Sequence, residues 1–412
     1  MKKHLLFALC SVLFLSACGT TAARLDAVRE EYAVGNFENQ KIGDRNLDPL
    51  LTGNALFQKD QFAASDAAFE DINRRMSSAQ STGVVSEVGK ALSGQMAGSY
   101  KPYFMDDLFV SYYQIWVALI DGRIADARAI INQSYAKQQA LSREFASLIR
   151  SREKDNNGLG AKLREDNAQW ASFSDIMNPA LTYLSGLYFL NYAETLSDFE
   201  TARTYLARAN GMVPGNEYVR SDLALAAAGN RPVNIAWVFI ESGFAPRLQE
   251  RRIDWPVLFG SGVSTISIAV SDAMIIPGSP APAGAKLLAD VDAMFMTEYK
   301  EYSVNEALRA VASVIAKGAV QHAANKHLGI IGGLGAAVYS IATTGAEIRS
   351  WITLPKYIYL LRVEKTGNND GLISLKIGDS VLSEIKVPRN GNHLIYIRMP
   401  TNAFEPKIIK TP

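Results

Sequence analysis

Two patterns of hydrophobic and polar residues divide this chain near Gly229. Before that point the pattern is typical of paired helices, in which small residues mark close approaches and aromatic or aliphatic residues fill the spaces between. After it, short β-branched and aromatic runs are bounded by Gly, Pro, Asn and Asp, which is typical of strands. The sequence therefore predicts an α+β protein, with a helical domain followed by a small β-sandwich or sheet domain that carries inserted helices.

The helical half matches one template three times. The template is the tetratricopeptide unit of about 34 residues, in which two antiparallel helices pack closely. The matches cover residues 50–72, 111–134 and 178–214, and the first has no gaps. We therefore predict a tetratricopeptide-like domain over residues 46–228, with a generic helical bundle as the alternative.

The second half, residues 229–412, predicts a β-rich domain. Its strand-like runs fall within residues 232–276 and 352–405, and Asn390-Gly391 offers a hairpin turn. A stretch of helical composition, at about residues 283–350, separates the two groups of strands. We expect this stretch to be a helical insertion in the sheet domain.

The start of the chain predicts export and lipidation. Lys2 and Lys3 precede an apolar run, residues 5–15, that is too short to span a bilayer, so residues 1–17 form a secretory signal. Residues Leu15 to Cys18 look like the lipobox of bacterial lipoproteins, in which the signal is removed before the cysteine and the thiol receives a diacylglycerol. Residues 18–45 are then the lipidated N-terminus and lead-in segment. A plain signal peptide with an incidental cysteine is the alternative.

A lipidated Cys18 predicts both the location and the partner of this protein. Two or more acyl chains hold a protein firmly to a membrane, whereas a single chain holds it only marginally. Residue 19 is Gly and not Asp, and by resemblance to enterobacterial sorting this favours the outer membrane over the inner membrane. We expect an outer-membrane lipoprotein that faces the periplasm and contacts the membrane through its N-terminal lipid.

Composition narrows the possibilities further. The chain has 412 residues, of which 48% are hydrophobic, so it can bury a large core. Loss of the signal removes Lys2 and Lys3 and leaves 40 basic against 41 acidic residues, a balance that disfavours nucleic acid as a partner. Cys10 leaves with the signal, so the mature chain retains only Cys18 and forms no internal disulfide.

The most hydrophobic stretch of the mature chain is residues 328–346, which include Gly329, Gly332, Gly333 and Gly335. By length alone it could span a membrane. Its Gly, Ser and Thr residues and the lack of a basic flank favour a tightly packed hairpin of helices. An intermediate reading places it against lipid or a partner helix.

Candidate chemical residues are few. Arg349, close to Trp351, is expected either to bind a carboxylate or glycan, or to pair with Glu347 or another acid and stack on the indole. Glu241 is either an acid catalyst or a partner for Arg349. No catalytic motif is present, and two of the histidines, His322 and His327, have the wrong spacing for a zinc site on a helix. We therefore expect no enzyme activity, cofactor or metal.

Several phrases also resemble a family of uncharacterised bacterial lipoproteins with tetratricopeptide-like helices. The likeness extends from about Tyr100 to the C-terminus. It rests on these residues: Asn178, Pro179, Tyr183, Leu184, Gly186, Glu241, Gly243, Pro246, Pro256, Arg349, Trp351, Leu354 and Pro355. Ala346-Glu347 departs from the family pattern of Ala-Asp. The resemblance implies architecture and location but no reaction.

These observations together predict an interaction scaffold. Helical repeats present extended surfaces, so the repeat domain is expected to offer a concave groove to another envelope protein. Two alternatives are a regulatory lipoprotein of a cell-wall synthase and a glycan-binding or ligand-binding module in the β-rich part.

Overall fold

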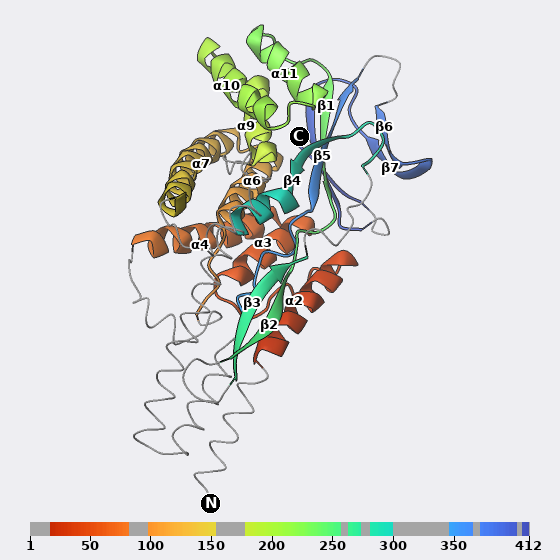
Figure 1. Cartoon of the computed structure of the whole chain (residues 1–412). Helices are drawn as coiled ribbons and strands as arrows, with labels where there is room; N and C mark the ends of the chain where they lie inside the picture. Colours follow the sequence, from red (N-terminus) through yellow and green to blue (C-terminus); the bar gives the residue numbers. More distant parts are fainter. Residues whose placement is uncertain are drawn as a thin grey trace, which may run out of the picture.

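The structure is a computed structural model, and Figure 1 shows its arrangement. It describes residues 17–81, 98–153, 178–256, 263–272, 281–299, 346–365, 371–401 and 406–411. Helices fill the N-terminal half and mixed sheets follow, which confirms the predicted α+β class. The signal peptide up to residue 16, the two histidines His322 and His327, and the apolar stretch apart from Ala346 lie outside the described residues.

The helices of the first half pack as neighbouring pairs. The pairs are α3 (Leu47–Gln58) with α4 (Phe62–Ser81), α6 (Phe104–Ile120) with α7 (Ile124–Glu153), and α9 (Pro179–Tyr192) with α10 (Leu196–Met212), followed by α11 (Glu217–Ala227). Local capping explains where they begin. Asn178, for example, accepts hydrogen bonds from the amides of Ala180 and Leu181, and Pro179 occupies the first helical position. Each pair overlaps one predicted unit, and a repeat origin remains a prediction.

Glycine permits the close approach of two of these pairs. A Cβ on Gly53 of α3 would lie 2.7 Å from the ring of Phe69 in α4. A Cβ on Gly186 of α9 would lie 2.8 Å from the side chain of Leu206 in α10 and 3.3 Å from its backbone nitrogen. Both glycines lie within the predicted units, residues 50–72 and 178–214, where small residues were expected at close approaches, and the structure supplies the steric reason.

A five-stranded sheet forms the centre of the second half, with the order β4-β5-β1-β8-β9. Its strands are β1 (Ile235–Ser242), β4 (Lys286–Asp290), β5 (Tyr357–Glu364), β8 (His393–Met399) and β9 (Lys407–Lys410). Strands β1 and β8 are parallel, and the other neighbours are antiparallel. Two separate ribbons, β2 (Leu248–Pro256) with β3 (Val263–Ser271) and β6 (Leu372–Ile377) with β7 (Ser380–Lys386), complete the second half.

The sheet is covered on both faces. Trp237, Phe239 and Tyr396 point toward the helices, and ring contacts join Phe239 to Trp116 of α6 at 5.2 Å and Tyr396 to Phe57 of α3 at 5.0 Å. The alternate residues of β1 and β8 form a second core with ribbon β6–β7. The inner sides of α3, α6 and α9 therefore pack on the chain's own sheet, and the core is continuous across the predicted domain boundary at residue 228.

Three segments differ from their expected structure. Residues 286–290, expected within the helical insertion, form edge strand β4, and a helix follows over residues 291–299. The five residues of β4 are too few for periodicity to separate strand from helix. The charged strand β2 and the short strand β9 were not predicted as strands. The lead-in segment begins as helix α2 (Ala17–Ala33).

The close approach at Gly186 gives a first testable prediction. Gly186→Ala is expected to lower the free energy of unfolding by about 1–3 kcal/mol, because the added methyl group overpacks the contact with Leu206. Urea denaturation of the lipid-free protein measures this change.

Gly211→Ala in α10 is the matched control. A Cβ at Gly211 meets no atom within 4 Å, so better helix propensity should leave stability unchanged or raise it by up to about 1 kcal/mol. Equal effects of the two substitutions would contradict the steric role of Gly186.

Candidate functional site

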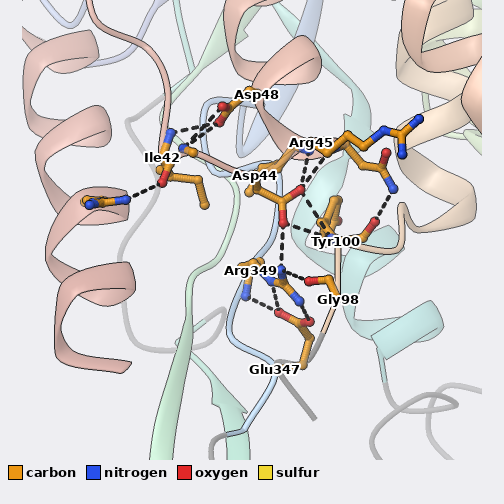
Figure 2. A network of polar contacts seen from close by, with 12 residues as sticks. Ile42, Asp44, Arg45, Asp48, Gly98, Tyr100, Glu347 and Arg349 are labelled. Atoms are coloured by element: carbon orange, nitrogen blue, oxygen red, sulfur yellow. Dashed lines mark hydrogen bonds and ion pairs between the residues drawn. The ribbon is translucent and has the colours of Figure 1, made fainter. Parts of the chain in front are cut away.

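Arg349 lies at the centre of a buried polar network (Figure 2). Its Nε donates to Glu347 at 2.7 Å, and its two terminal nitrogens reach the second Glu347 oxygen, Asp44 at 2.6 Å and the Gly98 carbonyl at 2.9 Å. The ion pair with Glu347 is the one that the sequence predicted. The partners from residues 44 and 98 join segments that lie far apart in the sequence.

Asp44 connects this network to the start of α3. One carboxylate oxygen accepts hydrogen bonds from the amides of Asn46 and Leu47, both at 2.9 Å, which caps the helix, and the other accepts from the amide of Tyr100 at 2.9 Å. Burial alone would lower the pKa of Arg349, but the hydrogen bonds and charges of Glu347 and Asp44 raise it on balance. Arg349 is 6% exposed, so this guanidinium serves internal contacts.

Trp351 is buried close to this network but does not stack on Arg349. Its indole nitrogen donates to Thr353 Oγ1 at 3.0 Å, and its rings lie 5.9 Å from Phe69 and 6.0 Å from Tyr113. The expected stacking is therefore not found, and the ring contacts of the indole are instead tilted contacts with two aromatic residues of the helices. Trp351 acts as a packing residue between the 346–356 segment and the helices.

Glu241 belongs to a second buried cluster and is not a partner of Arg349. Its Oε2 accepts hydrogen bonds from the hydroxyl groups of Tyr113 at 2.9 Å and Tyr396 at 2.7 Å, and lies 3.8 Å from Nε of Arg398. Gln58 donates to the Tyr396 hydroxyl at 3.0 Å. The alternative that paired Glu241 with Arg349 is therefore wrong, since Arg398 on the neighbouring strand supplies the positive charge.

Burial dominates the chemistry of Glu241. It raises the pKa of this carboxyl to about 7, against the opposing effects of the Arg398 charge and the two tyrosine hydroxyl groups. A carboxyl group with such a pKa could exchange a proton near neutrality. Both Glu241 and Arg398 are 0% exposed, however, so the cluster as it stands presents no surface to a substrate.

Two further carboxyl groups lie at the start of α6. Asp106 accepts hydrogen bonds from the Tyr100 hydroxyl at 2.7 Å and the Tyr103 amide at 2.9 Å, and Glu298 accepts from the first amides of the helix, including that of Met105 at 2.9 Å. Burial raises the pKa of Asp106 to about 7 and that of Glu298 to about 8, although these hydrogen bonds oppose the shift. Tyr100 links this group to Asp44 through its backbone amide.

Sequence reasoning missed Asp44, Arg398 and Glu298. A capping signal was available for Asp44, because it lies three residues before the start of α3. A charged residue inside the apolar run HLIYIRMP was the available signal for Arg398. We find no comparable signal for Glu298, whose hydrogen-bond partners lie more than 190 residues away.

Comparisons with known proteins add no assignment. No family model, curated protein or solved structure matches this chain. Within the described ranges, no helix is both long enough and apolar enough to cross a membrane. The same residues contain no group of three or more His, Cys, Asp or Glu side chains placed to hold a metal ion.

The Arg349 network predicts a strong effect of truncation. Arg349→Ala is expected to lower the free energy of unfolding by about 3–5 kcal/mol, because Asp44 and Glu347 lose the charge that compensates their burial. Denaturant unfolding of the wild type and the variant measures this change in the free energy of unfolding.

Arg203→Ala is the matched control, since Arg203 pairs with Glu200 on the surface of α10 and should contribute less than about 1 kcal/mol. Unchanged stability in Arg349→Ala, together with lost binding of peptidoglycan, would instead support the glycan-binding role.

The buried carboxyl groups predict that stability falls as pH rises. A carboxyl whose pKa is raised on folding holds its proton in the folded state after the unfolded chain has lost it. The free energy of unfolding should therefore decrease between about pH 4 and pH 8. Asp106→Asn should remove the contribution of this carboxyl group to the pH dependence. The free energy of unfolding of the variant should exceed that of the wild type by up to about 4 kcal/mol at pH 8 and should differ little from it near pH 4.

Denaturant unfolding across this pH range tests the prediction, and Asp126→Asn on the exposed surface of α7 is the control. A pH profile of Asp106→Asn that runs parallel to the wild type would show that Asp106 ionises normally.

Proposed function

We propose that this protein is a lipid-anchored scaffold of the bacterial cell envelope, with acyl chains on Cys18 and a protein partner in the periplasm. The lipobox at the end of a complete signal peptide supports the anchor. The resemblance to lipoproteins with tetratricopeptide-like helices supports the same location. The outer membrane is the proposed site, by the identity of residue 19.

The structural observation that carries this proposal is the attachment of α2 to the body. Cys18 is the second residue of this helix. Further along it, Leu25, Val28 and Tyr32 are buried, and the Tyr32 hydroxyl donates to Asn54 of α3. A lipid on Cys18 would therefore be connected through a packed helix to the core.

The outer side of the helical layer is the surface that we assign to a partner. The sheet covers the inner sides of α3, α6 and α9, so the concave groove expected from repeats is filled by the chain itself. Helices α4, α7 and α10 lie on the far side of this layer from the sheet (Figure 1). On α10, Leu196 is 84% exposed, and Glu200 and Arg203 form an exposed ion pair.

The anchor is tested by Cys18→Ala. This variant is expected to move from the membrane fraction to the soluble periplasmic fraction, because no thiol remains to receive the diacylglycerol. Fractionation followed by immunoblotting measures the shift.

Cys10→Ala is the matched control, because Cys10 lies within the signal and should not affect anchoring. Retention of Cys18→Ala on membranes in high salt would contradict the lipid anchor. Crosslinking in intact cells tests the scaffold role, and failure to attach any envelope protein to the wild-type chain would contradict it.

A further inference from the structure

Helix α2 leaves little free chain between the lipidation site and the folded body. Ala22 already packs against the core, and four helical residues span only about 6 Å. Leu25, Val28 and Tyr32 then fix the helix over its next two turns. The lipid attached to Cys18 must therefore lie close to one particular end of the molecule.

The ribbon β2–β3 begins beside the same helix. Arg247, immediately before β2, pairs with Asp26 of α2 at 2.5 Å and with Asp272, just after β3, at 3.1 Å. Arg29 of α2 donates to the carbonyl of Ala245 at 3.2 Å. Figure 1 shows the ribbon and the first turns of α2 running side by side toward the same end of the molecule.

Measured along its own axis, the ribbon is longer than the helix beyond this ion pair. From the Asp26–Arg247 pair, the eight residues back to Cys18 cover about 12 Å of helix, whereas the nine residues out to Pro256 cover about 30 Å of strand. If Cys18 lies at a bilayer surface, the outer part of the ribbon lies at the same end of the molecule and comes close to the headgroups.

The pairing of the two strands suggests that another surface covers the ribbon. Among the described strands, β2 and β3 hydrogen-bond only to each other, and a contact from Tyr299 to the Ala269 carbonyl supports β3 near the base of the ribbon. A two-stranded ribbon without further packing is only marginally stable in water. A surface that covers the ribbon would stabilise it.

We propose that a phospholipid bilayer is that surface. The first turn of α2 and the outer part of ribbon β2–β3 together form a membrane-facing end, which holds the body in one orientation with α10 and α11 away from the lipid. This inference rests on the lipidation of Cys18 proposed above, and it adds that the anchor is rigid. The other possible cover is the chain itself.

Single labels can test this orientation, because the only cysteine of the mature chain carries the lipid. Arg251→Cys places a fluorophore at an exposed position of β2, and Arg203→Cys places one on α10 as the matched control. The lipidated proteins are reconstituted in phosphatidylethanolamine and phosphatidylglycerol vesicles that contain lipids with a nitroxide on the headgroup. We expect quenching at position 251 to be at least threefold stronger than at position 203.

The outcomes separate this inference from the anchor. Mass spectrometry of the N-terminal peptide shows whether Cys18 is acylated, and an unmodified thiol would refute the anchor itself. Acylated protein with equal quenching at both positions would refute the orientation and leave the anchor intact.

Two further variants identify what covers the ribbon. A flexible insertion of 20 residues after Gly19 should reduce quenching at position 251 toward the control value, and unchanged quenching would refute the rigid connection. In the lipid-free Cys18→Ala protein, iodide should reach a label at 251 as readily as one at 203. Protection of position 251 there would show that the chain covers its own ribbon, and would overturn the proposal.

Discussion

An aromatic layer between the helices and the sheet holds this protein together. Trp116 of α6 lies at its centre, with ring contacts to Phe239 of β1 and Tyr396 of β8 at 5.2 and 5.7 Å. Such pairs contribute about 0.5–1.5 kcal/mol each beyond the burial of their area. Because both cysteines of the chain lie within its first 18 residues, no disulfide can link the later segments, and this packing has to hold them together.

The buried pair of Glu241 and Arg398 lies within this layer and affects the register in which strands β1 and β8 pair. The two residues are direct neighbours in the register of the parallel strands β1 and β8. Removing both charges from water is costly, and Tyr113, Tyr396 and the Thr353 carbonyl offset part of that cost. A slip of either strand by one residue would turn its charged residue toward the hydrophobic second core. We infer that the pair selects the register more than it adds stability.

The distance along the chain between interacting residues explains what the sequence could and could not predict. Helix starts at Asn178 and Thr195 were readable because the capping group and the capped amides are neighbours in the chain. The Arg349–Glu347 pair was readable for the same reason. Asp44 lies 305 residues from Arg349, and Arg398 lies 157 residues from Glu241, so both partners became visible only through the fold. Without that information, one of the two alternatives for Glu241 paired it with Arg349, whereas its neighbour in the fold is Arg398.

Helix α2 links the proposed anchor to these buried charges. Its ion pair between Asp26 and Arg247 is partly exposed and contributes little, so Leu25, Val28 and Tyr32 supply most of its attachment. The ring of Tyr32 lies under the Arg398 guanidinium, 5.6 Å from its centroid. Detachment of α2 would therefore bring water to Arg398 and Glu241 and weaken the cluster that fixes the register of the sheet. For this reason the N-terminal helix is part of the folded core, and a lipid at Cys18 would act on the core directly.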